Sequence, residues 1–357
     1  MLKFTNILFL TLTILVSSVH ASANTRNFLD LCLDNQLPEP QRATIDAVLE
    51  SIYAESCQQA ETELDDLITP LSLNFDDEEI DLSPLKSINN LNSLYIFKNS
   101  GINVETLSEM DQLKELHVEA LNVEGLASLK SLENLSRLTI NGFPLLDLSW
   151  LKGIKQLESL ALYRIRSAEL APLANLKKLK SLSLRYSDII SFAPIKHLAL
   201  EKLDLYRVSI QDIDSLSFLR NLKWVHIYGT NIPMSSVFIP MRELRTFDCI
   251  QCGLAEIQGL TKNSKLIGLT LEANFIEDIS PLSELSLLTY LNLSNNRIEN
   301  LIPLTSLIEL RTINLEYNLI EDISPLSVLI NASWARLEGN LLGEEVECPL
   351  INGTCSF

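Results

Sequence analysis

The chain has 357 residues, with 46 acidic and 28 basic side chains, and its formal charge at pH 7 is −18. A hydrophobic content of 46% excludes a disordered acidic chain, because it supplies enough apolar side chains for a core. The negative charge argues against nucleic acid as the main ligand, since phosphate contacts require a basic surface.

Residues 1–23 are expected to form a secretory signal peptide. Lys3 precedes an apolar run at 7–16, and the small residues Ala21 and Ala23 each suit a cleavage site. An uncleaved anchor is the alternative, but the run is shorter than the roughly 18 residues that span a bilayer. We expect an exported protein, periplasmic or secreted, with no stable membrane span after cleavage and with disulfides permitted.

Residues 24–67 are expected to form a helical N-terminal cap. Apolar side chains recur at helical spacing within 41–56, and Cys32 and Cys57 flank this segment. In an oxidising compartment these two cysteines are candidates for a disulfide.

Residues 68–342 repeat with a period of 22 residues. Segments 266–279, 288–301 and 310–323 match L-x-x-L-x-L-x-x-N-x-I-x-x-I, the leucine-rich repeat pattern of a short strand and a returning segment. We count thirteen turns, in which the third leucine position is filled by Leu73, Ile96, Val118, Ile140, Leu162, Leu184, Leu205, Ile227, Cys249, Leu271, Leu293, Leu315 and Leu337. The sequence therefore predicts a solenoid.

Residues 343–357 are expected to form a short C-terminal cap, because a solenoid exposes an apolar layer at each end. Cys348 and Cys355 lie within this segment and are a second candidate pair, which would staple the cap. A link from Cys32 to Cys348 would contradict this arrangement.

The period, the sequence DLSPL at 81–85, the sequence DISPL at 278–282 and 322–326, and the helical cap resemble the internalin-like leucine-rich repeat proteins of bacteria. The resemblance implies an α/β solenoid: a curved, right-handed horseshoe whose concave parallel sheet binds a protein partner. Unlike surface-anchored internalins, the chain is expected to lack an immunoglobulin-like domain after the repeats and a C-terminal anchor.

The ninth repeat position is expected to hold an inward Asn that bonds the backbone of the bend. Asn fills it in the last four turns and at Asn99. In the middle turns the position carries Leu121, Phe143, Ile165 and Val208, and we expect a less regular bend there.

The C-x-x-C pair Cys249 and Cys252 falls on two repeat positions that are buried elsewhere in the pattern. We interpret both residues as compact core side chains. A redox motif needs a helix N-terminus, and a zinc site needs two further ligands, which this register does not offer. Whether the pair forms a disulfide is left open.

Strand alternation places the third, fifth and seventh repeat positions on the concave face, with the eighth at its edge. In the fifth to eighth turns these positions carry nine aromatic or basic residues, here called the central patch: Tyr163, Arg164, Arg185, Tyr186, Tyr206, Arg207, Trp224, His226 and Tyr228. Such residues dominate interface hot spots, which predicts a partner-binding site. Alternatively, they only stabilise the sheet by stacking across strands.

His226 is predicted to lie between Asp204 and Asp248 on adjacent strands, with Ser183 two turns away. This spacing argues against a Ser-His-Asp triad. A metal held by His226 and the two carboxylates is less favoured than a simple cross-strand charge contact. We therefore predict no catalytic residue, metal or cofactor, although binding that changes with His226 protonation is a further alternative.

The sequence thus predicts an exported binding module, not an enzyme, that recognises a protein of unknown identity through the central patch. A carbohydrate receptor is one alternative, because stacked Tyr and Trp rings also suit sugar faces. A structural component of the envelope without a discrete ligand is the other.

Overall fold

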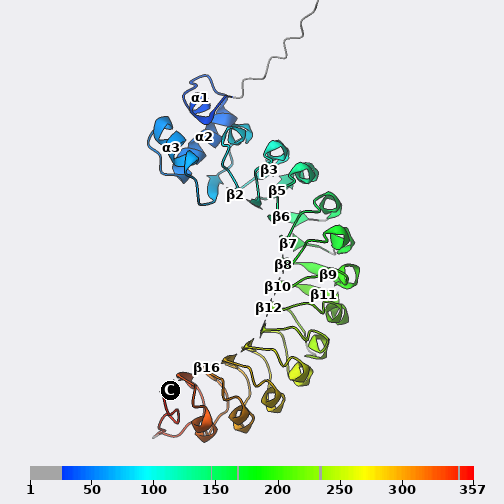
Figure 1. Ribbon diagram of the computed structural model, residues 1–357, viewed down its shortest axis with the longest axis vertical. Coiled ribbons are helices and arrows are strands. Elements are labelled where there is room, and N and C mark those ends of the chain that lie inside the picture. Colours follow the sequence, from blue (N-terminus) through cyan, green and yellow to red (C-terminus); the bar gives the residue numbers. More distant parts are fainter. Residues whose placement is uncertain (1–25, 146, 167–168, 233–234, 345) are drawn as a thin grey trace, which may run out of the picture.

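The computed structural model describes residues 26–357 except 146, 167–168, 233–234 and 345. These residues form an arc with strands along its inner edge and short helices along its outer edge (Figure 1). The predicted leucine-rich repeat horseshoe with a concave parallel sheet is confirmed. The predicted signal peptide, residues 1–23, lies outside the described residues.

The inner sheet of the described chain has 14 strands, and every pairing in it is parallel. Equal repeat positions face each other, as where Leu203 pairs with Leu182 and with Val225. Its strands, in order, are β1 Leu71–Phe75, β2 Ser93–Lys98, β4 Glu115–Glu119, β6 Arg137–Leu145, β7 Ser159–Ile165, β8 Ser181–Arg185, β10 Lys202–Tyr206, β12 Trp224–Tyr228, β13 Thr246–Ile250, β14 Gly268–Thr270, β15 Tyr290–Asn292, β16 Thr312–Asn314, β17 Trp334–Arg336 and β18 Thr354–Ser356.

The core lies between the sheet and the outer helices, and strand alternation explains it. On β10, Leu203 and Leu205 are 1% and 0% exposed, whereas Lys202, Asp204 and Tyr206 face outward. Full burial of one leucine side chain contributes roughly 2 kcal/mol. Repetition of this pattern in every turn stacks the turns into one continuous core.

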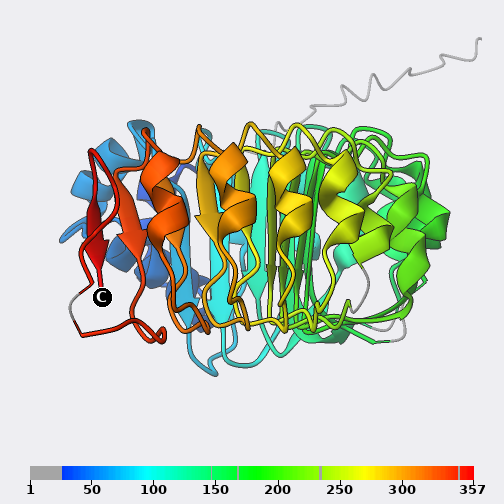
Figure 2. The same cartoon turned by 90° about the horizontal axis from the view of Figure 1, so that it is seen from below.

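Short 3-10 helices form the outer edge of the arc (Figure 2). In the D-I-S-P-L segments, the Asp278 carboxylate accepts the Ser280 backbone N–H at 2.8 Å, and Pro281 occupies the first helical turn. The helices are η1 Ser83–Ser87, η2 Glu105–Glu109, η3 Leu126–Ser131, η4 Ser149–Gly153, η5 Ala171–Asn175, η6 Ala193–Ile195, η7 Ile213–Phe218, η8 Ser235–Phe238, η9 Gln258–Lys262, η10 Ser280–Glu284, η11 Ile302–Ser306 and η12 Ser324–Val328.

Two small parallel sheets lie beside the main one. One pairs β3 (Gly101–Asn103) with β5 (Asn122–Glu124). The other pairs β9 (Asp188–Ser191) with β11 (Ser209–Asp212). Each of these short strands lies between the main strand of its turn and the following 3-10 helix.

Three helices precede the first strand: α1 Phe28–Cys32, α2 Glu39–Ser51 and α3 Cys57–Asp65. Ile45 and Val48 of α2 are fully buried, and α2 packs on β1, so the end of the sheet is covered. The Thr44 hydroxyl donates to the Asp81 carbonyl oxygen at 2.9 Å and ties this cap to the first turn.

Both predicted disulfide pairs are present. Cys32 joins Cys57 between α1 and α3, and Cys348 joins Cys355 on β18. A Cys32–Cys348 link is thereby excluded. The question left open for Cys249 and Cys252 is also answered: the two are bonded to each other, and both are 0% exposed in the core.

The inward Asn of the ninth position does bond the bend, as predicted. The Asn296 amide donates to the Leu271 and Leu293 carbonyl oxygens at 2.9 and 3.0 Å, and its carbonyl accepts the Ile276 N–H at 3.0 Å. Asn274, Asn318 and Asn340 make the corresponding bonds.

The prediction for Asn99 is wrong, because this side chain is exposed. In that turn the backbone stays extended to Lys98, which is 7% exposed and donates to the carbonyl oxygens of Asp76 and Glu78. A charged amine therefore bonds the bend from the eighth position.

In the middle turns, hydroxyl side chains replace Asn at the ninth position. The Ile165 N–H donates to the Ser187 hydroxyl at 3.1 Å, and the Val208 N–H donates to the Thr230 hydroxyl at 3.0 Å. Ile165 and Val208 themselves pack into the core. The bend is thus bonded in alternate turns by Ser or Thr.

Candidate functional site

The eighth repeat position adopts a left-handed backbone conformation from the fifth turn onward. Its φ angle is 56° at Arg164, 51° at Tyr186 and 50° at Arg207. The N–H of Tyr186 donates to the Tyr206 carbonyl at 2.8 Å, and that of Arg207 donates to the Tyr228 carbonyl at 2.7 Å. A left-handed residue interrupts strand alternation, so seventh and eighth side chains share one rim of the concave face.

Three tyrosines form a continuous stack along this rim. The Tyr186 ring meets the Tyr206 ring edge-on, with centroids 5.1 Å apart. The Tyr206 and Tyr228 rings are stacked, with centroids 4.8 Å apart and an angle of 7° between the ring planes. Stacking holds each ring in place and covers part of its face, while the phenol edges stay at the surface.

The arginines of the central patch differ in their contacts. Arg185 donates to the Asp204 carboxylate at 2.9 Å, and its guanidinium lies 5.6 Å from the Tyr163 ring. Burial alone would lower the pKa of Arg185, but the hydrogen bond to Asp204 raises it above its usual value. Arg207 lies 5.8 Å from the Tyr206 ring and forms no ion pair within the described chain. Arg185 is therefore held by the sheet, whereas Arg207 is exposed and has no carboxylate partner among the described residues.

Arg164 stands apart from the stack. It lines a hollow of about 850 Å³ between helix α2 and the first strands, together with Asp46, Glu50 and Glu119. The structure thus brings together eight residues of the central patch along β7, β8, β10 and β12, and directs the ninth toward the N-terminal cap.

Trp224 and His226 form a second row on β12, where they occupy the third and fifth repeat positions. They line a hollow of about 420 Å³ with Lys202, Thr246 and Asp248. The His226 Nδ1 lies 3.4 Å from Asp248 Oδ2. This hydrogen bond raises the pKa of His226 above the usual 6.5, against partial burial, and the charge of Asp204 adds to the rise.

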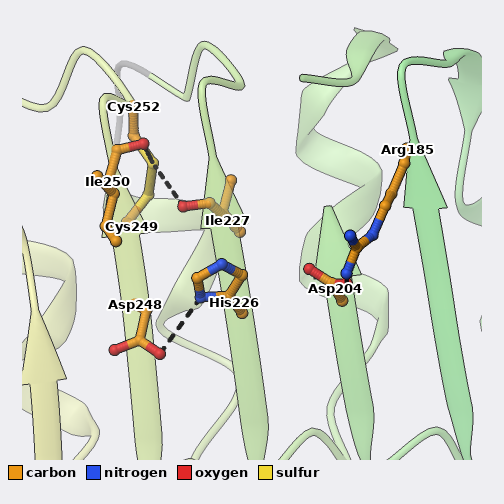
Figure 3. Close-up of polar contacts among 8 residues, drawn as sticks. All are labelled: Arg185, Asp204, His226, Ile227, Asp248, Cys249, Ile250 and Cys252. Atoms are coloured by element: carbon orange, nitrogen blue, oxygen red, sulfur yellow. Dashed lines mark hydrogen bonds and ion pairs between the residues drawn. A yellow bond between two sulfur atoms is a disulfide. The ribbon is translucent and has the colours of Figure 1, made fainter. Parts of the chain in front are cut away.

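The acid, imidazole and hydroxyl groups considered for catalysis do not form a triad. Figure 3 shows His226 directed toward Asp248 and Arg185 directed toward Asp204. The Ser183 hydroxyl donates to Asp204 Oδ2 at 2.8 Å, and the same oxygen accepts from Arg185. His226 instead contacts Asp248, on the other side of β12. In the described part of the chain, no group of three or more His, Cys, Asp or Glu residues could hold a metal ion.

On β4, which precedes the central patch, Glu115 is the centre of a hydrogen-bonded cluster. Glu115 accepts from the Tyr95 hydroxyl and from Arg137, both at 2.9 Å. Burial opposes ionisation of Glu115, but these hydrogen bonds keep its pKa below the usual value. Nearby His117 behaves oppositely to His226, because burial lowers its pKa despite the charges of Glu119 and Glu115.

One group of concave residues was not predicted from the sequence. Tyr290, Trp334 and Arg336 line a hollow of about 560 Å³ over β15, β16 and β17. Tyr290 and Trp334 occupy the third repeat position, as Trp224 does, so the repeat register could have located them. The last four turns also carry Glu272, Glu316 and Glu338 on the concave face, so composition alone does not distinguish this group.

No helix among the described residues is both long and apolar enough to cross a membrane. The expectation that the apolar segment 1–23 is a cleaved signal peptide and not a membrane anchor concerns residues that the structure does not describe.

Comparisons with known proteins agree with this architecture. Residues 286–328 match a family model described as leucine-rich repeats in two copies. No curated protein matches the chain. An internalin (inlF) from Listeria monocytogenes has a similar structure, with a TM-score of 0.72 at 22% identity over 94% of this chain and 98% of that one.

More distant structures share the fold. A leucine-rich repeat protein of Leptospira interrogans aligns with a TM-score of 0.51 at 16% identity, over 85% of this chain and 92% of that one. The plant peptide hormone receptor RGFR1, in complex with RGF2, gives 0.53 at 20% identity, over 76% of this chain and 47% of that one. By its repeats and its architecture, the chain has a leucine-rich repeat fold similar to that of the internalin.

Proposed function

We propose that the protein is an exported binding module that recognises a protein partner through the central patch. The N-terminal segment 1–23 and the three disulfides support export, because disulfides persist in oxidising compartments. Binding, rather than catalysis, agrees with the separation of Ser183 from His226 by a full strand.

The observation that carries the proposal is the tyrosine stack flanked by unpaired Arg207. Tyr186, Tyr206 and Tyr228 present fixed phenol edges, so little rotational freedom is lost when a partner covers them. Arg207 adds a guanidinium that makes no ion pair in the described chain. Together they offer apolar area and charge-assisted donors on one rim.

Cross-strand stabilisation accounts for only part of this arrangement. The parallel contact of Tyr206 with Tyr228 and the bond of Arg185 to Asp204 stabilise the sheet itself. Tyr186, which is 48% exposed, and exposed Arg207 each contact the Tyr206 ring, but their side chains make no hydrogen bond or ion pair within the described residues. An accessible aromatic and cationic rim in a chain of charge −18 therefore favours recognition of a partner.

Structural relatives provide support at the level of the fold. The receptor RGFR1 was determined with RGF2 bound, so a scaffold of this type can present a ligand site. None of these structures identifies the partner of this chain, so the partner has to be found by experiment.

The test is affinity capture with the mature chain from envelope and host-surface extracts, read by mass spectrometry. The variant Tyr206→Ala/Arg207→Ala removes the seventh and eighth side chains of one turn. Its matched control, Glu316→Ala/Tyr317→Ala, removes the same two positions in another turn, including a left-handed residue. We expect a protein that wild type and control retain and that the folded patch variant loses.

Other outcomes would favour the alternatives. Retention of the same proteins by all three baits would mean that the central patch is only cross-strand packing. Release of the captured material by a glycan mixture would indicate a carbohydrate receptor. Stable co-fractionation with the envelope that survives loss of the patch would indicate a structural component.

A further inference from the structure

The concave face carries a second, separate hollow near its C-terminal end. It measures about 560 Å³ and lies over β15, β16 and β17, well along the sheet from the central patch on β8, β10 and β12. This volume lies within the usual range for small-molecule sites, about 300 to 1,000 Å³. Its size is therefore sufficient for a short ligand.

Two aromatic rings in this hollow occupy the same repeat position on different strands. Tyr290 and Trp334 are both paired in register with Thr312, which places them one on each side of a central strand. Two strand spacings separate them by about 9.6 Å. They are 42% and 44% exposed, so neither ring is part of the core.

These rings differ from the tyrosines of the central patch in their contacts. Tyr206 and Tyr228 cover one another, but Tyr290 and Trp334 have no ring, cation or side-chain hydrogen-bond partner in the described parts of the chain. Their faces, and not only their edges, are therefore available. A small residue, Thr312, lies between them, so a flat ligand could cover both.

The polar side chains of the hollow are fixed in place. The Asn292 amide donates to Glu272 at 3.1 Å, and the Asn314 amide donates to Glu316 at 3.2 Å. Each Asn carbonyl accepts a backbone N–H two residues later, at 3.0 Å. The two carboxylates are thus oriented acceptors, and the amides do not turn freely.

Charge in the hollow is mixed. The carboxylates of Glu272 and Glu316 provide acceptors, and the Arg336 guanidinium, which forms no ion pair within the described residues, provides donors. An anionic ligand would meet the carboxylates, and a cationic ligand would meet Arg336. A neutral ligand with many hydroxyl groups can use both kinds of partner.

We propose that this hollow binds a neutral oligosaccharide. Pyranose rings have flat C–H faces that pack on aromatic faces, and hydroxyl groups at their edges that both donate and accept hydrogen bonds. Tyr290 and Trp334, two strand spacings apart, would stack on the first and third sugar rings of a trisaccharide. Arg336 and the two glutamates would bond the hydroxyls between them. The site is independent of the central patch, whose partner is a protein.

The test is titration of the mature chain with maltotriose, cellotriose, N,N′,N″-triacetylchitotriose, mannotriose and β-linked galactotriose, followed by tryptophan fluorescence and calorimetry. The variant Trp334→Ala removes one platform. Trp224→Ala is the matched control, because Trp224 occupies the same repeat position and is 43% exposed, against 44% for Trp334. Circular dichroism checks folding, and Trp334→Phe keeps a ring in place.

We expect at least one of these sugars to bind, with the affinity reduced about tenfold or more by Trp334→Ala. Trp224→Ala should leave it unchanged, and Trp334→Phe should retain most of it. Absence of binding to every sugar at millimolar concentration would overturn the proposal, as would equal loss in the two tryptophan variants. Loss of a captured protein in Trp334→Ala, without sugar binding, would make this a protein surface instead. A loss confined to Trp334→Ala leaves the proposal for the central patch unaffected, whereas an equal loss in Trp224→Ala would place sugar binding at the central patch, to which Trp224 belongs.

Discussion

The side-chain amide of Asn296 shows how one residue can support a whole turn. It bonds two carbonyl groups and one N–H of the bend in the core, where water cannot replace it. Leaving such groups unpaired costs about 1–3 kcal/mol for each. The same amide at Asn99, on the surface, carries no such cost.

We therefore predict that Asn296→Ala lowers the free energy of unfolding by about 2 kcal/mol or more. Asn99→Ala should change it by less than about 0.5 kcal/mol, because an exposed polar side chain is removed. Urea unfolding followed by circular dichroism measures both. Equal losses in the two variants would show that the bend bonds do not stabilise the turns.

The pKa values of His226 and His117, which lie on the same sheet, are shifted in opposite directions. The pKa of His226 is raised above 6.5, chiefly by the hydrogen bond to Asp248, and that of His117 is lowered by burial. His226 therefore contributes stability that is present below pH 6.5 and lost as the pH rises through its raised pKa. His117 contributes stability above pH 6.5 that is lost as the pH falls through its lowered pKa.

The Asp248→Asn variant tests this assignment. It removes the carboxylate that holds the His226 proton, so the pKa of His226 should fall toward or below its usual value. His117, several strands away, should keep its titration and serves as the internal control. Two-dimensional NMR of the imidazole resonances between pH 5 and 8 measures both. An unchanged His226 curve would contradict the role of Asp248.

At the scale of elements, the N-terminal cap depends on its disulfide. Cys32 and Cys57 are 25 residues apart and join α1 to α3, while α2 packs between them and the sheet. On the chain-entropy model a loop of this length stabilises by about 3.5 kcal/mol. The shorter Cys348–Cys355 loop, with a separation of 7, corresponds to about 2.5 kcal/mol.

The double variant Cys32→Ala/Cys57→Ala should therefore open the cap before the turns. We expect faster amide exchange in Glu39–Ser51 and in β1, with protection in β14 to β17 unchanged. Hydrogen exchange with mass spectrometry measures this directly. Unchanged protection of α2 would mean that packing of Ile45 and Val48 is sufficient without the covalent link.

Element positions were largely predictable, because a 22-residue period fixes which side chains face the core. The helical cap and two of the disulfides followed from apolar spacing and from cysteine positions. The left-handed eighth position was not predictable from Arg164, Tyr186 or Arg207, which are residues that seldom adopt it. That conformation is imposed by the hydrogen bond of each N–H to the next turn, so it depends on stacking.

The register of the repeats predicts which residues lie together on the concave face better than it predicts their contacts. Register alone places Tyr206 beside Tyr228 and Asp204 beside His226. The pairing of Asp204 with Arg185 depends on side-chain length and direction, and sequence spacing contains neither. Whether the central patch is the binding site stays a prediction until the capture experiment is done.

At the scale of the whole molecule, the charge of −18 lies along an extended arc. Ion pairs such as Lys265 with Glu243 offset it locally, but they are exposed and contribute little. Repulsion between the remaining carboxylates should therefore destabilise neighbouring turns at low ionic strength.

We predict that the melting temperature rises when sodium chloride increases from about 10 mM to about 150 mM, as the Debye length falls from about 30 Å to about 8 Å. Differential scanning calorimetry at constant pH measures the change. Sucrose at matched osmolality is the control for effects unrelated to charge. A melting temperature that is constant or falls with salt would show that exposed ion pairs outweigh the repulsion.

The left-handed column also limits how this surface can be varied. Valine, isoleucine and threonine are strained at positive φ, so the eighth position admits glycine, asparagine and unbranched or aromatic residues but resists β-branched ones. At Gly339 the limit is tighter, because an added Cβ would come within 2.4 Å of the Tyr317 ring. A combinatorial library built on this scaffold should randomise the third, fifth and seventh positions freely and restrict the alphabet at the eighth.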